Sequence, residues 1–350
     1  MNTGLVLRRR AVSLRLSPAS VLLGSVTWAL ALAVAAVSLT LGDYPMSLSE
    51  VAATLTGNGT LISYDVVVRN RLPRALVALG VGAALAISGG IFQRLARNPL
   101  VSPDVIGINA GASAGAVVTI TVVGAGAGTV AGGALAGAAI AALLVYAIAH
   151  RNGFSGYRLV LVGIGVTALL SSAASFLLTR ADRNEAFQAA IWLVGTVAGR
   201  TWVHVATVAG ALAMLAPVVL APVVLALSRQ LRLLELGDDL ARTLAGRVQL
   251  GRALLLAAGV GLAALATAAA GPIAFVALVA PQIVRRLLAE RTAGLVPASG
   301  AGALVVVGAD LVTRRLFSPY ELPAGVITAL VGAPVLLYLL VRANRIGAGG

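Results

Sequence analysis

The sequence contains neither cysteine nor lysine among its 350 residues, so arginine carries all 26 of its basic charges. Without cysteine the chain can form no disulfide, no thiolate metal site and no cysteine nucleophile. Without lysine it lacks the Gly-Lys-Ser/Thr ending of a phosphate-binding P-loop, and we do not expect it to hydrolyse ATP through such a loop. The glycine cluster GAGAGTVAGG (Gly124–Gly133) is therefore interpreted as a turn and a helix-packing segment.

Charged residues are scarce as well. They make up 11% of the chain, whereas a soluble domain carries roughly 25%. Apolar residues make up 59% and the mean hydropathy is +0.98, so a soluble fold would have no polar surface to present. These values predict a membrane protein. The net charge of +14 could suggest nucleic acid, but in a membrane chain it favours arginine that faces the cytoplasm and anionic lipid.

Ten apolar runs are candidates for membrane helices, each of which needs about 20 residues. Arg8, Arg9 and Arg10 precede the first run, which we interpret as a span and not as a cleavable signal. With a cytoplasmic N-terminus, 18 of the 26 arginines lie inside and eight outside, which supports that orientation. The predicted fold is all-α, a polytopic membrane protein with about ten transmembrane helices and both termini in the cytoplasm. The spans are placed at roughly 19–41, 73–92, 104–123, 129–149, 158–178, 202–227, 250–270, 273–289, 297–313 and 323–342.

The predicted layout is a cytoplasmic segment at 1–18, one membrane domain at 19–345 with a cytoplasmic loop at about 228–249, and a tail at 346–350. Two outer segments between spans have helical patterns. SLSEVAATL (Ser47–Leu55) predicts a short helix with Ser47 or Ser49 as its N-cap. RADRNEAFQAAIWLVG (Arg180–Gly195) predicts a helix that lies along the membrane surface.

The outer arginines contradict the usual charge bias and need a partner. Arg71 and Arg74 flank Pro73, the predicted first residue of a span, where the positive end of the helix dipole disfavours a cation by about 0.3–1 kcal/mol. An acidic protein partner would remove this conflict. The alternatives are that the outer arginines bind lipid phosphates or pair with acidic residues of the same chain, namely Glu321, Asp310 and Asp65.

Seven blocks of sequence follow one another along the chain. They are RLPR (Arg71–Arg74), GAALAISG (Gly82–Gly89), RNPLVSPDVIG (Arg97–Gly107), LELGDDLARTLAG (Leu234–Gly246), GPIAFVALVAPQIVRR (Gly271–Arg286), GADLVTR (Gly308–Arg314) and ELPAGVITALVGAPVLLYLL (Glu321–Leu340). In this order they resemble the permease family of ABC importers for iron-siderophores, haem and vitamin B12, and the resemblance covers about Ala19 to Arg345. The block SPDVIGINAGA is more similar to the ferric-enterobactin type than to the vitamin B12 permease.

This resemblance implies a transport subunit in the cytoplasmic membrane of a bacterium. It would work with a second permease subunit, a dimer of cytoplasmic ABC ATPases and an extracytoplasmic substrate-binding protein. ATP would be used by the ATPase, and no cofactor, metal or nucleic acid would be bound by this chain. The implied substrate is a ferric siderophore, with haem or a corrinoid as the alternative. The enterobactin-type wording favours a heterodimer of two different permeases over a homodimer.

The resemblance also assigns residues to two contacts with partner proteins. Arg71, Arg74 and Arg314 match positions that face the binding protein, and Arg69 and Arg315 are their neighbours. The cytoplasmic segment Leu231–Gly246 matches the part that sits in a cleft of the ATPase, although the family wording ARxLG is interrupted here by Ala245. The alternative for this segment is an amphipathic loop on lipid headgroups. Its predicted coupling residues are Gly237, Asp238, Asp239, Leu240, Ala241, Arg242, Leu244 and Gly246.

Small polar residues within the spans are candidates for the lining of the transport pathway. Thr167, Ser171 and Ser175 share one helix face, although such side chains also bond to their own helix or join neighbouring helices. The complete set is Asn109, Ser113, Thr167, Ser171, Ser172 and Ser175. His150 and His204 lie near span ends without a second ligand at metal spacing, and we interpret both as interfacial residues.

Two other classes of protein fit the sequence less well. An ion-coupled transporter needs ionisable groups at mid-membrane depth, and only Asp310 comes near to this, close to an outer end. An intramembrane hydrolase would need a histidine placed with a carboxylate or a serine across facing spans, which the pattern does not supply.

Overall fold

The computed structural model describes residues 5–9, 12–96, 98–124, 126–149, 156–220, 248–288, 294–316 and 320–347. An antiparallel pair of short strands, β1 (Leu5–Arg9) and β2 (Val12–Leu16), precedes the first helix. The other regular elements of the described chain are helices, which confirms the predicted all-α membrane fold.

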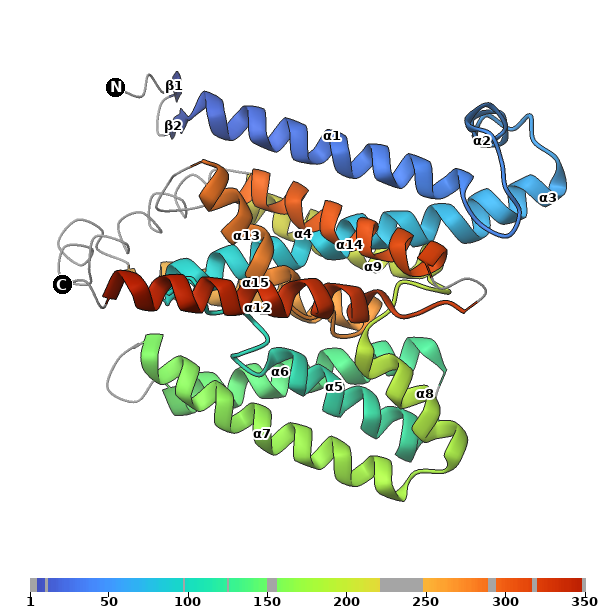
Figure 1. Cartoon of the computed structure of the whole chain (residues 1–350). Helices are drawn as coiled ribbons and strands as arrows, with labels where there is room; N and C mark the ends of the chain where they lie inside the picture. The colour runs from blue at the N-terminus through green and yellow to red at the C-terminus, as the bar shows by residue number, and fades with distance from the viewer. Residues whose placement is uncertain are drawn as a thin grey trace.

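Each of the ten predicted spans coincides with a helix in the described part of the chain. Six helices are apolar and long enough to cross a membrane, namely α1, α4, α6, α7, α12 and α14. The start of α1 and the end of α15 lie at the same end of the bundle (Figure 1). The helices are α1 (Pro18–Thr40), α4 (Leu72–Leu95), α5 (Ile108–Val118) with its π-helical extension η2 (Thr119–Val123), α6 (Ala127–Ala149), α7 (Gly156–Arg180), α9 (Trp202–Leu220), α12 (Val248–Ala270), α13 (Val276–Leu287), α14 (Leu295–Leu316) and α15 (Ala324–Gly347).

Short helices lie at the opposite end, which is the outer end in the predicted orientation (Figure 1). The segment after α1 forms α2 (Leu48–Leu55), α3 (Leu61–Tyr64) and the π-helical segment η1 (Asp65–Arg71), which continues into α4. The helix predicted along the surface is α8 (Arg183–Val194), with Asp182 at its N-cap.

Ser47 is the N-cap of α2, which is one of the two residues predicted for this position, Ser47 and Ser49. Its hydroxyl accepts from the Glu50 N–H at 3.2 Å, while its own N–H donates to Glu50 Oε2 at 2.7 Å. The two hydrogen bonds form a capping box, and donation from the backbone and hydroxyl of Ser47 lowers the pKa of Glu50.

Helix α4 is the centre of the larger helix group and packs against α14, α12, α13 and α9, with α1 on the far side of α14. Its approach to α14 is possible only because Gly82 faces Gly302. A Cβ atom at Gly82 would lie 2.3 Å from the Gly302 carbonyl oxygen. Small residues bring backbones together where lipid supplies no hydrophobic driving force between helices.

The helices α5, α6 and α7 form a second group at one side of the bundle (Figure 1). Glycines spaced four residues apart let α5 and α6 approach closely. Gly111 and Gly115 lie directly against Gly137 and Gly133 of α6, where a Cβ atom would overlap the facing backbone. Helix α12 contacts α4 of the first group and α5 and α6 of the second.

The third predicted span begins later than expected. Asp104 was predicted in the first helical turn, but it lies in a turn that ends at Gly107, and α5 begins at Ile108. Gly107 has a φ of 91°, a left-handed conformation that interrupts any helix through it and that L-residues disfavour. The eighth span is also short, because the chain is not helical between Gly271 and Phe275, where Phe275 has a φ of 67°.

Candidate functional site

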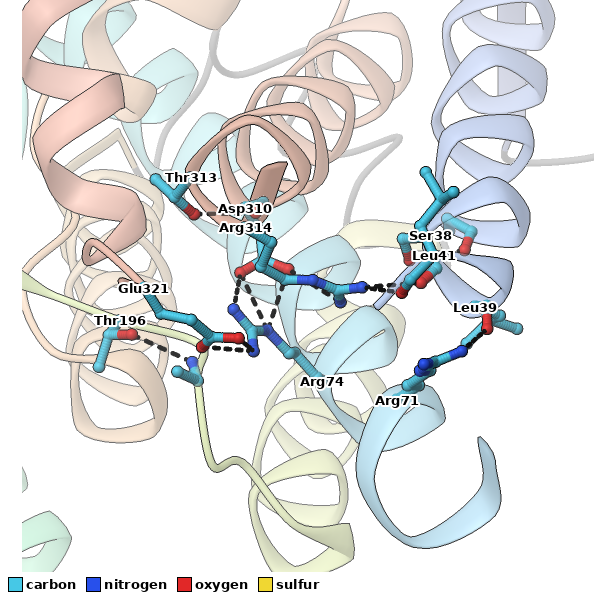
Figure 2. A network of polar contacts seen from close by, with 12 residues as sticks. Ser38, Leu39, Leu41, Arg71, Arg74, Thr196, Asp310, Thr313, Arg314 and Glu321 are labelled. Atoms are coloured by element: carbon cyan, nitrogen blue, oxygen red, sulfur yellow. Dashed lines mark hydrogen bonds and ion pairs between the residues drawn. The ribbon is translucent and has the colours of Figure 1, made fainter. Parts of the chain in front are cut away.

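The outer end of the bundle holds a buried ion pair between two neighbouring helices, α4 and α14, that are far apart in the sequence (Figure 2). Arg74, in the first turn of α4, donates from Nε and Nη2 to Asp310 of α14 at 3.0 and 2.8 Å. Its Nη1 donates to Glu321 Oε2 at 2.9 Å, in the segment that precedes α15. The side chains of Arg74 and Asp310 are only 11% and 5% exposed. Arg74 is therefore fixed within its own chain by two carboxylates.

Two further arginines bond to the C-terminal end of α1 (Figure 2). Arg314 donates from Nη2 to the carbonyl oxygens of Ser38 and Leu41 at 3.0 and 2.6 Å. Arg71 donates from Nη1 to the Leu39 carbonyl at 2.7 Å and from Nη2 to that of Tyr44 at 2.6 Å. The last carbonyls of a helix have no partner within the helix, and its C-terminus carries about half a negative charge.

These contacts give a physical reason for arginine on the outer side. We call the group Arg71, Arg74, Asp310, Arg314 and Glu321 the outer clasp. Its three guanidinium groups face two carboxylates and the negative end of α1, so most of its charge is balanced within the chain. Arg74 pairs with Asp310 and Glu321, so the structure contains the pairing within one chain that the sequence left open as an alternative. Docking by Arg71, Arg74 and Arg314 stays a prediction.

Arg69 and Arg315 differ from the arginines of the outer clasp because their side chains are exposed. Arg69 is 71% exposed and pairs with Asp65 at 3.3 Å, one turn away on η1. Arg315 is exposed at the end of α14, directly after Arg314. They are accessible positive charges beside the outer clasp, and their assignment to docking also stays a prediction.

A second polar contact, which sequence reasoning missed, joins α4 to α13 near the turn that follows α4. Gln282 is 1% exposed, and its Nε2 donates to Gln93 Oε1 at 2.8 Å and to the Pro99 carbonyl at 2.7 Å. Gln93 in turn donates to the Leu278 carbonyl at 3.2 Å. The signal in the sequence was one amide side chain in each of two mainly apolar helices.

The candidate pathway residues fall into two different environments. Asn109 is buried, donates to Asp104 and accepts from the Thr267 hydroxyl at 2.9 Å, which ties α5 to α12. Ser113 is half-buried on α5. On α7, Thr167 is half-buried with its hydroxyl oxygen unpartnered in the described chain, whereas Ser171 and Ser175 are exposed.

Ser172, also exposed, donates to the Ala168 carbonyl of its own helix at 2.8 Å. Ser171, Ser172 and Ser175 therefore face outward from this chain, whereas Thr167 lies against Gly107. The role of these residues in a pathway remains a prediction.

The predicted coupling residues, from Gly237 to Gly246, and His150 lie outside the described residues. His204 is in the first turn of α9, where Nδ1 accepts from the Thr201 N–H at 3.2 Å and Nε2 lies 3.4 Å from Arg200. It thus caps the start of a helix at the outer end.

The region of this chain that is similar to known proteins includes both helix groups and the outer clasp. A family model, the FecCD transport family, matches residues 30–342. The ferric enterobactin transport system permease protein FepG of Escherichia coli K12 is 42% identical over 306 residues, which cover 87% of this chain and 91% of that protein. The achromobactin transport system permease protein CbrC of Dickeya dadantii is 42% identical over 318 residues, 89% of each chain.

The arrangement of the helices is also found in a solved structure. A metal-chelate type ABC transporter in an inward-facing conformation is 28% identical to this chain. It superposes with a TM-score of 0.77 over 91% of this chain and 98% of that one. With a family match that spans almost every described helix, this chain belongs to the FecCD transport family, a family of membrane-spanning permease subunits of ABC importers.

Proposed function

We propose that this chain moves a ferric siderophore across the bacterial cytoplasmic membrane as the permease subunit of an ATP-driven importer. The observation that carries the proposal is the 42% identity to FepG, which extends over 87% of this chain. Identity of that extent includes both helix groups and not one motif alone. Haem and a corrinoid remain the alternative substrates within the family.

The proposed importer contains three kinds of partner. A second permease chain, different from this one, completes the membrane part, and a dimer of ATPases on the cytoplasmic side binds the segment Leu231–Gly246. An extracytoplasmic binding protein delivers the substrate to the outer end. The absence of a P-loop lysine supports the division of labour, because this chain has no such loop with which to bind ATP itself.

The environment of Asp310 favours this function over ion-coupled transport. A coupling carboxylate must be free to exchange an ion or a proton as the transporter works. Asp310 is instead bonded to the Nε and Nη2 atoms of Arg74 and lies near the outer end of α14. Its geometry supports a role in holding helices together.

The outer face is the proposed docking surface for the binding protein. Arg69 and Arg315 present exposed positive charge there, and the arginines of the outer clasp lie beside them. Exposed charge pairs contribute only about 0–1 kcal/mol each, but charges of complementary sign steer two proteins into contact. We therefore propose that acidic groups of the binding protein first meet Arg69 and Arg315.

Reversal of these two charges tests the docking surface without disturbing the outer clasp. The double variant Arg69→Glu, Arg315→Glu should associate with the binding protein more slowly at low salt. The deficit should shrink as salt rises, because the screening length falls to about 3 Å at 1 M. The measurement is the association rate on nanodisc-held transporter as a function of ionic strength.

Arg183→Glu is the matched control, since Arg183 is an exposed arginine on α8 at the same end of the molecule. Its association rate should stay near that of the wild type. Equal rates for the double variant and the wild type at low salt would contradict the assignment of the docking surface.

A further inference from the structure

The two carboxylates of the outer clasp are held very differently. Asp310 is 5% exposed and accepts from two nitrogens of Arg74. Glu321 is 50% exposed and meets Arg74 only at Nη1. A buried charge that loses its partner is costly, whereas an exposed pair is worth about 0–1 kcal/mol. Asp310 is therefore a fixed partner of Arg74, and Glu321 is an easily displaced one.

Arg74 would remain well positioned if Glu321 left it. The Nε and Nη2 atoms stay on Asp310, so the planar guanidinium cannot turn away. Nη1 would then point out of the protein with an open donor position. The geometry is that of a preformed binding position for one carboxylate, which Glu321 occupies in the free chain (Figure 2).

Glu321 also holds the connection between α14 and α15. Tyr320 beside it is exposed, and α15 begins three residues later at Ala324. On the other side, the Gly325 N–H donates to the Gly195 carbonyl, at the end of α8, at 3.0 Å. The contact with Arg74 thus ties the start of α15 to α4. Loss of this contact would release the start of α15 from α4, while its contact with Gly195 and the packing of α15 against α13 and α14 remain.

We propose that Glu321 is an exchangeable carboxylate: an acidic side chain of the docking protein replaces it on Arg74 Nη1, and the exchange releases the start of α15. The inference rests on the proposed function, because it takes the incoming carboxylate from the binding protein. Docking at the outer face is thereby coupled to the mobility of a transmembrane helix. The exchange conserves the number of ion pairs, so it changes the conformation at small net energy.

The variant Glu321→Gln tests the exchange, because it removes the competing charge and keeps the side-chain size. The affinity of nanodisc-held transporter for the binding protein should rise about 2- to 5-fold at low salt, the equivalent of one exposed pair that need not be broken. Asp182→Asn is the matched control. It removes an exposed carboxylate at the N-cap of α8, at the same end of the molecule, and changes the net charge equally, while asparagine caps a helix as well as aspartate does. It should leave the affinity within about 2-fold.

Amide hydrogen exchange at Gly325 and Val326 gives a second readout that does not depend on affinity. In the wild type these amides should exchange faster when the binding protein docks. In Glu321→Gln they should exchange faster without it, and in Asp182→Asn they should not. An affinity for Glu321→Gln no higher than that of Asp182→Asn, or exchange at these amides unaffected by docking, would overturn the proposal alone. A wild-type transporter that binds no binding protein would overturn the proposed function with it.

Discussion

Arg74→Met is expected to destabilise the folded chain by about 3–5 kcal/mol, the cost of leaving a buried charge without its partner. Methionine retains the apolar stem of the side chain but takes the guanidinium at 2.8 Å away from Asp310, which is only 5% exposed. Asp310 then keeps only the more distant Arg314, at 3.9 Å. The attachment of Glu321 to α4 is lost as well. Thermal unfolding of the detergent-solubilised protein, followed by the fraction that remains monodisperse, measures the loss.

A second substitution separates charge from packing. Asp310→Asn in the Arg74→Met background removes the unpaired charge and should recover a large part of the lost stability. Arg69→Met is the control for an exposed pair and should cost about 1 kcal/mol or less. If Arg74→Met proved as stable as Arg69→Met, the outer clasp would not hold α4 to α14.

Asp239→Gly with Leu240→Asp is expected to abolish uptake while the chain is still inserted in the membrane. The sequence of Leu231–Gly246 predicts a short helix with apolar residues on about one face, and a helix this short would not be stable alone in water. It therefore depends on a surface to rest on, which we propose is the ATPase. The double change removes an acidic residue from the start of the predicted helix and places a charge on its apolar face. Copurification of the ATPase and transport by the same preparation measure the effect.

The paired change Ser228→Gly, Gln230→Asp is the control, because it makes similar substitutions in the same loop just before the segment. That variant should bind the ATPase and transport as the wild type does. Normal ATPase binding by the Asp239/Leu240 variant would show that coupling occurs elsewhere.

The positions of the helices could be predicted because each span carries its own signal. An apolar run of about 20 residues cannot be accommodated otherwise in this chain, and every predicted span coincides with a described helix. The cap of α2 was predicted only as Ser47 or Ser49, and the reciprocal hydrogen bonds with Glu50 identify it as Ser47. The start of α5 was not, because the left-handed turn at Gly107 depends on the neighbouring α7, whose Gly163 and Thr167 lie against it.

The contacts of the outer clasp could not be predicted from the sequence of one chain. Arg74 and Asp310 are 236 residues apart, and the sequence offered Glu321, Asp310 and Asp65 as equal same-chain partners. Arg314 Nη1 lies 3.9 Å from Asp310 Oδ2, one of the partners that the sequence offered. The backbone partners of Arg71 and Arg314 were missed, because they are carbonyls at the end of α1 and at Tyr44 and not side chains. Only the packing of α1 against α14 and η1 brings those carbonyls within reach.

Uptake in the natural host shows whether this chain moves a ferric siderophore. Cells that lack the chain should be compared with cells that regain it as wild type or as the Asp239/Leu240 variant. The substrates are radioiron-labelled siderophores, ferric enterobactin among them, with labelled haem and cobalamin as alternatives. We predict that uptake of at least one ferric siderophore is lost without the chain, restored by the wild type and not by the variant. Unchanged uptake of every ferric siderophore, or loss confined to haem or cobalamin, would show that this chain does not carry a ferric siderophore.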